Sequence, residues 1–424
     1  MKRKLISCIL VLSVFITLLS GCGTNKRAED ATTPEEIETR VESTVFQEEI
    51  SAEPSPDHYL NLAKCAVDDM LNNWWDGDDE TGHIKFANHG FHTKDLTIES
   101  TCPWETSMVL FGIYDMWVLT GDDYYKNKVI AEANLYRENM NPEVLDFASG
   151  NYNWASDDCG WNALMYLTFY HVTGDEWFVD RAINLLDSVM DRWYNESDDL
   201  LYYKDGADYM SYYEAGIALC WLRIWEITGE QRFYDLALAS YQRLQKHLGR
   251  PDGLYYAEAN RYWGLGDKDS INEAGSSSAL AGNMCMATLS AKFFKITGEQ
   301  EYLDRVYSTN TGMLKYYDRD GVLLNDRDAW TNATFAAFYV SEVLSLPDTE
   351  AMQELLLNTA DSIYTNARTD DGHYGGSWNG PAQGNGSIWY LKGSTPQQCM
   401  TTGTSVMMIT AAALLETGVS DYCR

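Results

Sequence analysis

The chain has 424 residues, of which 45% are hydrophobic and 13% aromatic. This composition excludes a disordered protein and allows a large buried core, in one big domain or two ordinary ones. The formal net charge of -32 argues against nucleic acid as a partner, because a phosphate backbone would be repelled. Neutral polymers such as glycans carry no such penalty.

Residues 1–21 have the features of a secretory signal peptide. MKRK is followed by one apolar stretch and then by LSGC, which ends at Cys22. This ending resembles a bacterial lipobox, which implies cleavage before Cys22 and lipid on its thiol; a retained membrane anchor is the alternative. Residues 22–57 are acidic, contain few large apolar residues and predict a flexible tether. We therefore expect a protein anchored by lipid on the extracellular face of the bacterial cell membrane.

A Thr-Gly-acid pattern recurs through residues 58–424. Clear copies are LTGDDYY from Leu119, VTGDEWF from Val172, ITGEQRF from Ile227 and ITGEQEY from Ile296, with weaker copies from Leu346 and Leu415. Each copy predicts an apolar helix that ends at Thr-Gly, followed by a helix that begins at the acid. The first copies stand about 54 residues apart, which is room for two helices and two connections.

The two kinds of predicted helix differ in their apolar patterns. Helices that end at the turns are apolar on nearly all sides, as in 108–119 and 215–225, and should be buried all round. Helices that begin at the turns are one-sided, as in 178–193. About twelve alternating helices predict an all-α fold, an (α/α)6 barrel of six inner and six outer helices. The alternative is an open solenoid of helical hairpins of the tetratricopeptide type, whose repeat is too short for these spacings.

A second recurrence locates one end of the barrel. DDLLYY from Asp198, PDGLYY from Pro251, DRDGVLL from Asp318 and DDGHYGG from Asp370 each follow an outer helix and predict tight turns with short strands. These loops all lead from an outer helix to an inner one, so they should gather at one mouth. The cysteines after Cys22 show no metal-ligand spacing, and we expect no metal and no cofactor.

Asp157 and Asp158 are the candidate catalytic pair. They lie in NYNWASDDCGWNA, between Trp154 and Trp161, immediately before an inner helix. A glycosidase needs two carboxylates beside an aromatic surface for the sugar. In an extended loop, neighbouring side chains could point to opposite sides of a bound sugar, and the two acids should titrate as a coupled pair. The other Asp-Asp pairs of this acidic chain are expected in solvated turns and helix caps.

Tryptophans near the predicted mouth are candidate sugar-binding residues. They are Trp104, Trp154, Trp161, Trp263, Trp330 and Trp378. Exposed aromatic rings suit the faces of sugars. The alternative for any one of them is that it packs beneath its own loop.

Three segments resemble glycoside hydrolase family 76: SDDCGWNALMYLTFYHVTGDEWFVDRA from Ser156, GGSWNGP from Gly375 and QQCMTTGTSVMMITAAALL from Gln397. The resemblance implies an (α/α)6 barrel that hydrolyses α-1,6-mannan with retention and endo action. By this match, Asp157 is the nucleophile and Asp158 the general acid/base. We expect a monomer that takes a polysaccharide or oligosaccharide substrate.

Two other classes remain open from the sequence. One is another (α/α)6 enzyme of the unsaturated uronyl hydrolase type, which would need basic residues for the uronate. Such residues are sparse near the predicted mouth, chiefly Arg261, Arg327 and Lys392. The other is a glycan-binding lipoprotein without catalysis, for which aromatic residues suffice.

Overall fold

The computed structural model describes residues 57–78, 81–84, 103–139, 156–197, 199–202, 208–260, 279–325, 332–382, 399–419 and 422. The expected signal peptide, Cys22 and all but the last residue of the expected tether lie outside this part of the chain.

Helices make up most of the described residues. The outer helices are α1 (His58–Trp74), α3 (Asp123–Asn139), α5 (Glu176–Trp193), α7 (Gln231–Leu248), α9 (Gln300–Tyr317) and α11 (Glu350–Asn366). The inner helices are α2 (Pro103–Thr120), α4 (Ser156–Thr173), α6 (Ser211–Thr228), α8 (Leu280–Thr297), α10 (Ala336–Tyr339) with its π-helical continuation η2 (Val340–Leu344), and α12 (Cys399–Thr417).

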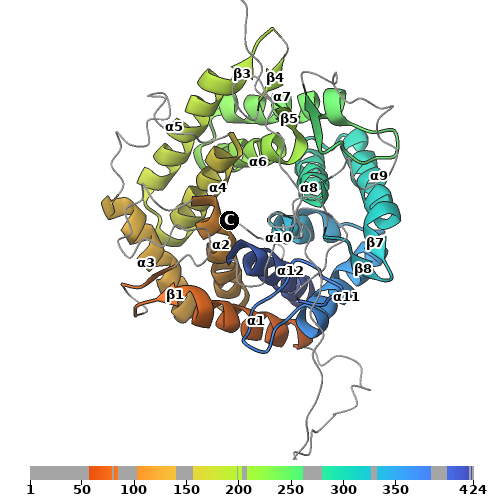
Figure 1. Cartoon of the computed structure of the whole chain (residues 1–424). Helices are drawn as coiled ribbons and strands as arrows, with labels where there is room; N and C mark the ends of the chain where they lie inside the picture. Colours follow the sequence, from red (N-terminus) through yellow and green to blue (C-terminus); the bar gives the residue numbers. More distant parts are fainter. Residues whose placement is uncertain are drawn as a thin grey trace, which may run out of the picture. The chain divides into compact units, whose positions relative to one another are not determined.

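The inner helices form a closed ring. Each contacts the next in chain order from α2 to α12, and α12 packs against α2. The outer helices pack on the inner ones, so that the ring is surrounded by a second layer (Figure 1). The predicted (α/α)6 barrel is therefore confirmed. An open solenoid is wrong for this chain, because its first and last inner helices would not meet.

Burial separates the two layers as the apolar patterns predict. Outer helix α5 buries one face, which includes Phe178, Leu186 and Trp193. Inner helix α6 is buried along nearly its whole length, from Ser211 to Ile224. Within the described residues one helix, α12, is long and apolar enough to cross a membrane, but 89% of its apolar window is buried inside the barrel. Its hydrophobicity is thus explained by the core.

The Thr-Gly turns end the inner helices in a repeated way. Gly229 has φ 71°, a left-handed conformation that glycine adopts without a steric penalty. Thr228 Oγ1 donates to the carbonyl of Ile224 at 2.9 Å and accepts the backbone N–H of Glu230 at 3.2 Å. The same two hydrogen bonds recur at the other three clear copies. In the weaker copy from Leu346, Asp348 takes the left-handed conformation.

Short antiparallel strands follow outer helices. They are β1 (Trp75–Asp76) with β2 (His83–Ile84), β3 (Tyr194–Asn195) with β4 (Leu200–Leu201), β5 (Asp208–Met210) with β6 (Glu258–Asn260), and β7 (Asp318–Arg319) with β8 (Val322–Leu323). The predicted hairpins at Asp198 and Asp318 are confirmed. The pair β5–β6 is a different case, because it joins two loops that stand far apart in the sequence.

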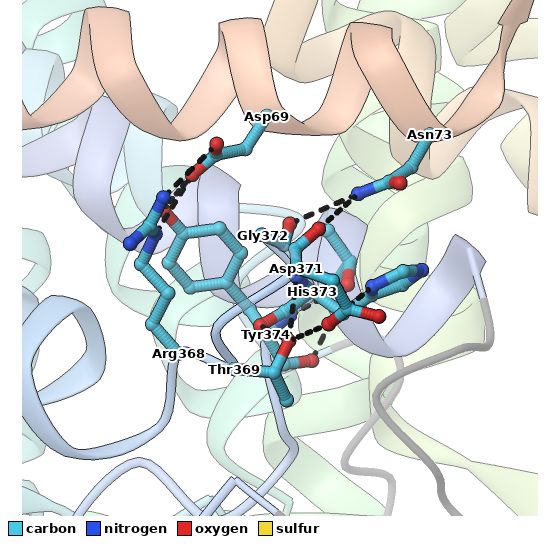
Figure 2. A network of polar contacts seen from close by, with 9 residues as sticks. Asp69, Asn73, Arg368, Thr369, Asp371, Gly372, His373 and Tyr374 are labelled. Carbon is cyan, nitrogen blue, oxygen red and sulfur yellow. Dashed lines mark hydrogen bonds and ion pairs between the residues drawn. The ribbon is translucent and has the colours of Figure 1, made fainter. Parts of the chain in front are cut away.

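A polar network holds the connection between α11 and α12 against α1. The guanidinium of Arg368 donates two hydrogen bonds to the carboxylate of Asp69, at 2.8 and 3.1 Å. The Tyr374 hydroxyl donates to the same carboxylate at 2.9 Å, and the Asn73 amide donates to the Gly372 carbonyl at 3.2 Å. Figure 2 shows Asp69 and Asn73 reaching from α1 toward Arg368, Gly372 and Tyr374 of the turn. A bidentate arginine–carboxylate pair is a strong and geometrically specific interaction, so this loop is fixed to the barrel wall.

Candidate active site

Loops that precede different inner helices hydrogen-bond to one another. The amide of Asn325, before α10, donates to the Gly376 carbonyl, before α12, at 2.7 Å. The backbone N–H of Ala281, at the start of α8, donates to Asn332 Oδ1, before α10, at 3.4 Å. The connections that enter the inner helices therefore lie at one end of the barrel, as the sequence predicts. We call this end the mouth.

Asp157 and Asp158 lie in the first turn of α4 and are half-buried. The expectation of an extended loop at this point is wrong, because the helix begins one residue earlier, at Ser156. Acidic side chains suit this position, since the unpaired N–H groups of a first helical turn favour negative charge. Consecutive residues of an α-helix project about 100° apart around its axis. The helix thus directs the two carboxyl groups differently without an extended backbone.

Trp161 lies on α4, one helical turn after Asp157, and is packed inside the barrel. It stands four residues after Asp157, on the same face of α4. Its ring packs against that of Phe335, with 5.6 Å between ring centres, and is 4% exposed. Trp161 is therefore buried and packed, whereas the sequence predicts an exposed aromatic surface for the sugar. Because Phe335 lies between α8 and α10 in the chain, the contact crosses the interior of the barrel and shows that this face of α4 points inward.

Phe335 also packs closely against Gly216 of α6. A Cβ atom on Gly216 would lie 3.0 Å from Cζ of Phe335, tighter than ordinary van der Waals contact. The absent side chain lets the phenylalanine ring pack close to the wall of the barrel. Sequence reasoning missed both Phe335 and Gly216, because each stands in a uniformly apolar segment that gives no sign of which side chains meet across the axis.

Cys159 lies next to the acid pair and is fully buried. Burial raises the pKa of its thiol well above the usual value, and the carboxylates of Asp158 and Asp157 raise it further. The guanidinium of Arg192 opposes this only in part. The thiol therefore stays protonated at neutral pH and is unsuited to act as a nucleophile. Within the described ranges no cluster of three metal-ligating side chains occurs.

Trp378 is a core residue, contrary to the expectation of an exposed aromatic. Its side chain is 1% exposed, and its indole N–H donates to Ser405 Oγ on α12 at 3.1 Å. Its backbone carbonyl accepts from Ser362 Oγ on α11 at 2.9 Å. The GGSWNGP segment thus packs its tryptophan against the neighbouring helices. For this residue the alternative reading, a ring packed beneath its own loop, is correct.

The side chains of the other candidate tryptophans are not among the described ones. Trp104 lies in the first turn of α2, and its side chain is not among the described ones. Trp154, Trp263 and Trp330 lie outside the described residues, as do Arg261, Arg327 and Lys392. Sugar binding by these four tryptophans stays a prediction.

The closed double ring of helices with an acid pair at its mouth defines the fold class, an (α/α)6 barrel, which is also the fold of glycoside hydrolase family 76. The α-1,6-mannanase of this family from Salegentibacter sp. HEL1_6 is similar over 84% of this chain and 99% of its own, with a TM-score of 0.63 and 20% identity. A family 76 mannosidase from Bacteroides thetaiotaomicron is similar over 85% of this chain and 99% of its own, with a TM-score of 0.61 and 16% identity.

A second kind of enzyme shares the fold. The unsaturated glucuronyl hydrolase of Bacillus sp. GL1 is similar over 86% of this chain and 98% of its own, with a TM-score of 0.57 and 17% identity. By sequence, the chain matches no family profile and no curated protein. The similarity to the solved structures is one of fold, and it covers the whole barrel rather than only the three segments that resemble family 76 in sequence.

Proposed function

We propose that this protein is a glycoside hydrolase of the family 76 type that cleaves α-mannosidic linkages, with α-1,6-mannan as the polymer. It acts as a monomer, needs no cofactor, and uses Asp157 and Asp158. The observation that carries the proposal is the acid pair in the first turn of an inner helix, at the mouth of a barrel shared with family 76 enzymes. An inactive variant of the Salegentibacter mannanase has asparagine in place of two consecutive aspartates and was obtained with bound α-1,6-mannotriose.

Other Asp pairs in the described part of the chain are used differently. On outer helix α1, Asp68 accepts from Lys64 and Tyr125, and Asp69 holds Arg368. Asp122–Asp123 begins outer helix α3, and Asp370–Asp371 lies in a turn. Within the described residues, the pair at 157–158 is the one that lies on an inner helix. This placement favours it as the reacting pair.

The reaction has two steps, in which Asp158 first donates a proton and then accepts one. Asp157 attacks the anomeric carbon and forms a glycosyl ester, while Asp158 gives its proton to the departing glycosidic oxygen. Asp158 then takes a proton from water, which attacks the same carbon and releases Asp157 as a carboxylate. The start of α4 favours the charged form of the nucleophile, because the positive end of the helix lies beside it.

Product analysis on unbranched α-1,6-mannan tests the proposal. We expect early release of a mixture of oligosaccharides, and the first-formed product should have the α configuration in a proton NMR time course. A first product with the β configuration would show inversion and overturn the assigned roles. Turnover of unsaturated uronyl disaccharides alone would favour the uronyl hydrolase, and binding without turnover of any glycan would favour a glycan-binding lipoprotein.

We also propose that lipid on Cys22 holds the mature protein on the outer face of the bacterial membrane. The support is the LSGC sequence and the acidic segment that follows it. Cys22→Ala should leave the protein unprocessed or release it into the medium, as measured by membrane fractionation and by the mass of the N-terminal peptide. Cys8→Ala, within the apolar stretch, is the matched control and should fractionate like the wild type. Normal processing and membrane retention of Cys22→Ala would rule out lipid attachment at this residue.

A further inference from the structure

A polar cavity lies on the outer wall of the barrel, away from the acid pair. It has a volume of about 470 Å³ and is lined by residues of outer helices α7 and α9: Tyr241, Gln242, Gln245, Lys246, Glu301, Tyr302 and Arg305. Figure 1 shows these helices as successive members of the outer layer, on either side of α8. Ligand sites in proteins commonly have volumes of about 300–1,000 Å³, so the cavity is large enough for a few sugar units.

The back of the cavity is held in place by packed aromatic rings. The rings of Tyr241 and Tyr302 lie 5.6 Å apart, and Tyr302 stacks on Phe293 of α8 at 5.4 Å. Gln245 donates to the hydroxyl of Tyr241 at 3.0 Å and also to that of Tyr255. Tyr241 and Tyr302 are both buried. A wall fixed in this way loses little conformational freedom when a ligand binds.

The rim of the cavity offers polar groups that are not engaged elsewhere in the described part of the chain. Gln242 and Glu301 are exposed, Arg305 is half-buried, and none of the three has a hydrogen bond or ion pair with a described residue. Glu301 and Arg305 are four residues apart and share one face of α9. Together the three supply amide, carboxylate and guanidinium groups, which can donate to and accept from sugar hydroxyls.

The rim of the cavity carries charges of both signs and no strong excess of either. Lys246 Nζ lies 3.8 Å from Asp199 Oδ2, and Glu301 and Arg305 contribute one charge of each sign to the cavity lining. An anionic polymer would also approach a chain whose formal net charge is -32. A neutral polyhydroxyl chain is not repelled by this negative charge.

We propose that this cavity is a second binding site for neutral polysaccharide, which holds a stretch of the polymer on the outer wall while the mouth acts on another. The identity of the polymer as α-mannan rests on the proposed function, but the site itself does not. Two sites on one polymer raise the apparent affinity, because the second contact forms within an already bound complex.

Affinity electrophoresis tests the site in an Asp157→Asn/Asp158→Asn background, so that the polymer in the gel stays intact. Separate gels contain unbranched α-1,6-mannan, galactomannan or polygalacturonate. Adding Gln242→Ala and Arg305→Ala should raise the apparent Kd for α-mannan about tenfold, the size expected from losing hydrogen bonds to a charged group. Gln231→Ala with Arg232→Ala removes the same residue types from the first turn of α7, outside the cavity, and should migrate like the parent.

The outcomes separate this site from the proposed function. Equal retardation of the cavity variant and the matched control in all three gels would overturn the site. Loss of retardation confined to polygalacturonate would also overturn it, because the ligand would then be anionic. Loss confined to galactomannan would support the neutral-polymer site and would count against α-mannan as the substrate.

Discussion

Asp157→Asn should lower kcat/KM on α-1,6-mannan by about 10⁴-fold or more, because it removes the nucleophile that forms the glycosyl ester. The substitution is nearly isosteric and lies at a half-buried position, so the fold should survive. Activity on a mannoside with an activated aryl leaving group should be lost equally, since that substrate also requires attack at the anomeric carbon. Initial rates on both substrates, with circular dichroism as a check of folding, measure these effects.

Asp158→Asn should separate the two substrates. Loss on the polymer should match that of Asp157→Asn, while the activated aryl mannoside should be partly spared because its leaving group needs no protonation. Asp123→Asn is the matched control, since Asp123 also lies in the first turn of a helix as the second acid of a pair, on outer helix α3. Near wild-type turnover of both 157 and 158 variants would show that this pair is not catalytic.

Trp378→Ala should destabilise the barrel by about 3–5 kcal/mol, the usual cost of truncating a buried tryptophan. The indole is 1% exposed and its N–H is bonded to Ser405, so the change leaves a cavity between α11 and α12 and removes a hydrogen bond to Ser405 Oγ, which keeps its own bond to the Gly375 carbonyl at 3.0 Å. Thermal unfolding should show a Tm lower by roughly 5 °C or more. Trp378→Phe keeps part of the side-chain volume but loses the N–H. Its Tm should lie between those of the wild type and Trp378→Ala.

Trp225→Ala is the matched control for this effect. Trp225 is a half-buried tryptophan near the end of α6, at the opposite end of the barrel, and packs against Tyr234 at 5.3 Å. Its loss should cost less stability, because less of the ring is removed from the core. If Trp378→Ala kept the wild-type Tm and raised KM for long oligosaccharides, the residue would be a sugar platform after all.

The helices, their order and their inner or outer position follow from local features of the sequence. The spacing of hydrophobic residues within a single helix predicts whether that helix is buried on one face or on all sides, and this spacing is local information. The Thr-Gly turns are local too: the threonine hydroxyl and the left-handed glycine act within a few residues, as at Thr228 and Gly229. Asp157 and Asp158 stand out in the sequence because they border a predicted inner helix, and the structure places them in the first turn of that helix.

Contacts between side chains of distant segments depend on how the helices pack in three dimensions. Closure of the ring depends on α12 reaching α2, and the β5–β6 pair joins two separate loops. The same holds for the burial of Trp378 and for the contact of Trp161 with Phe335. The local sequence of a glycine-rich loop with a tryptophan is the same whether the ring is exposed to a sugar or buried in the core. The choice is made by the neighbouring helices, because burial of the ring depends on the cavity that they leave open.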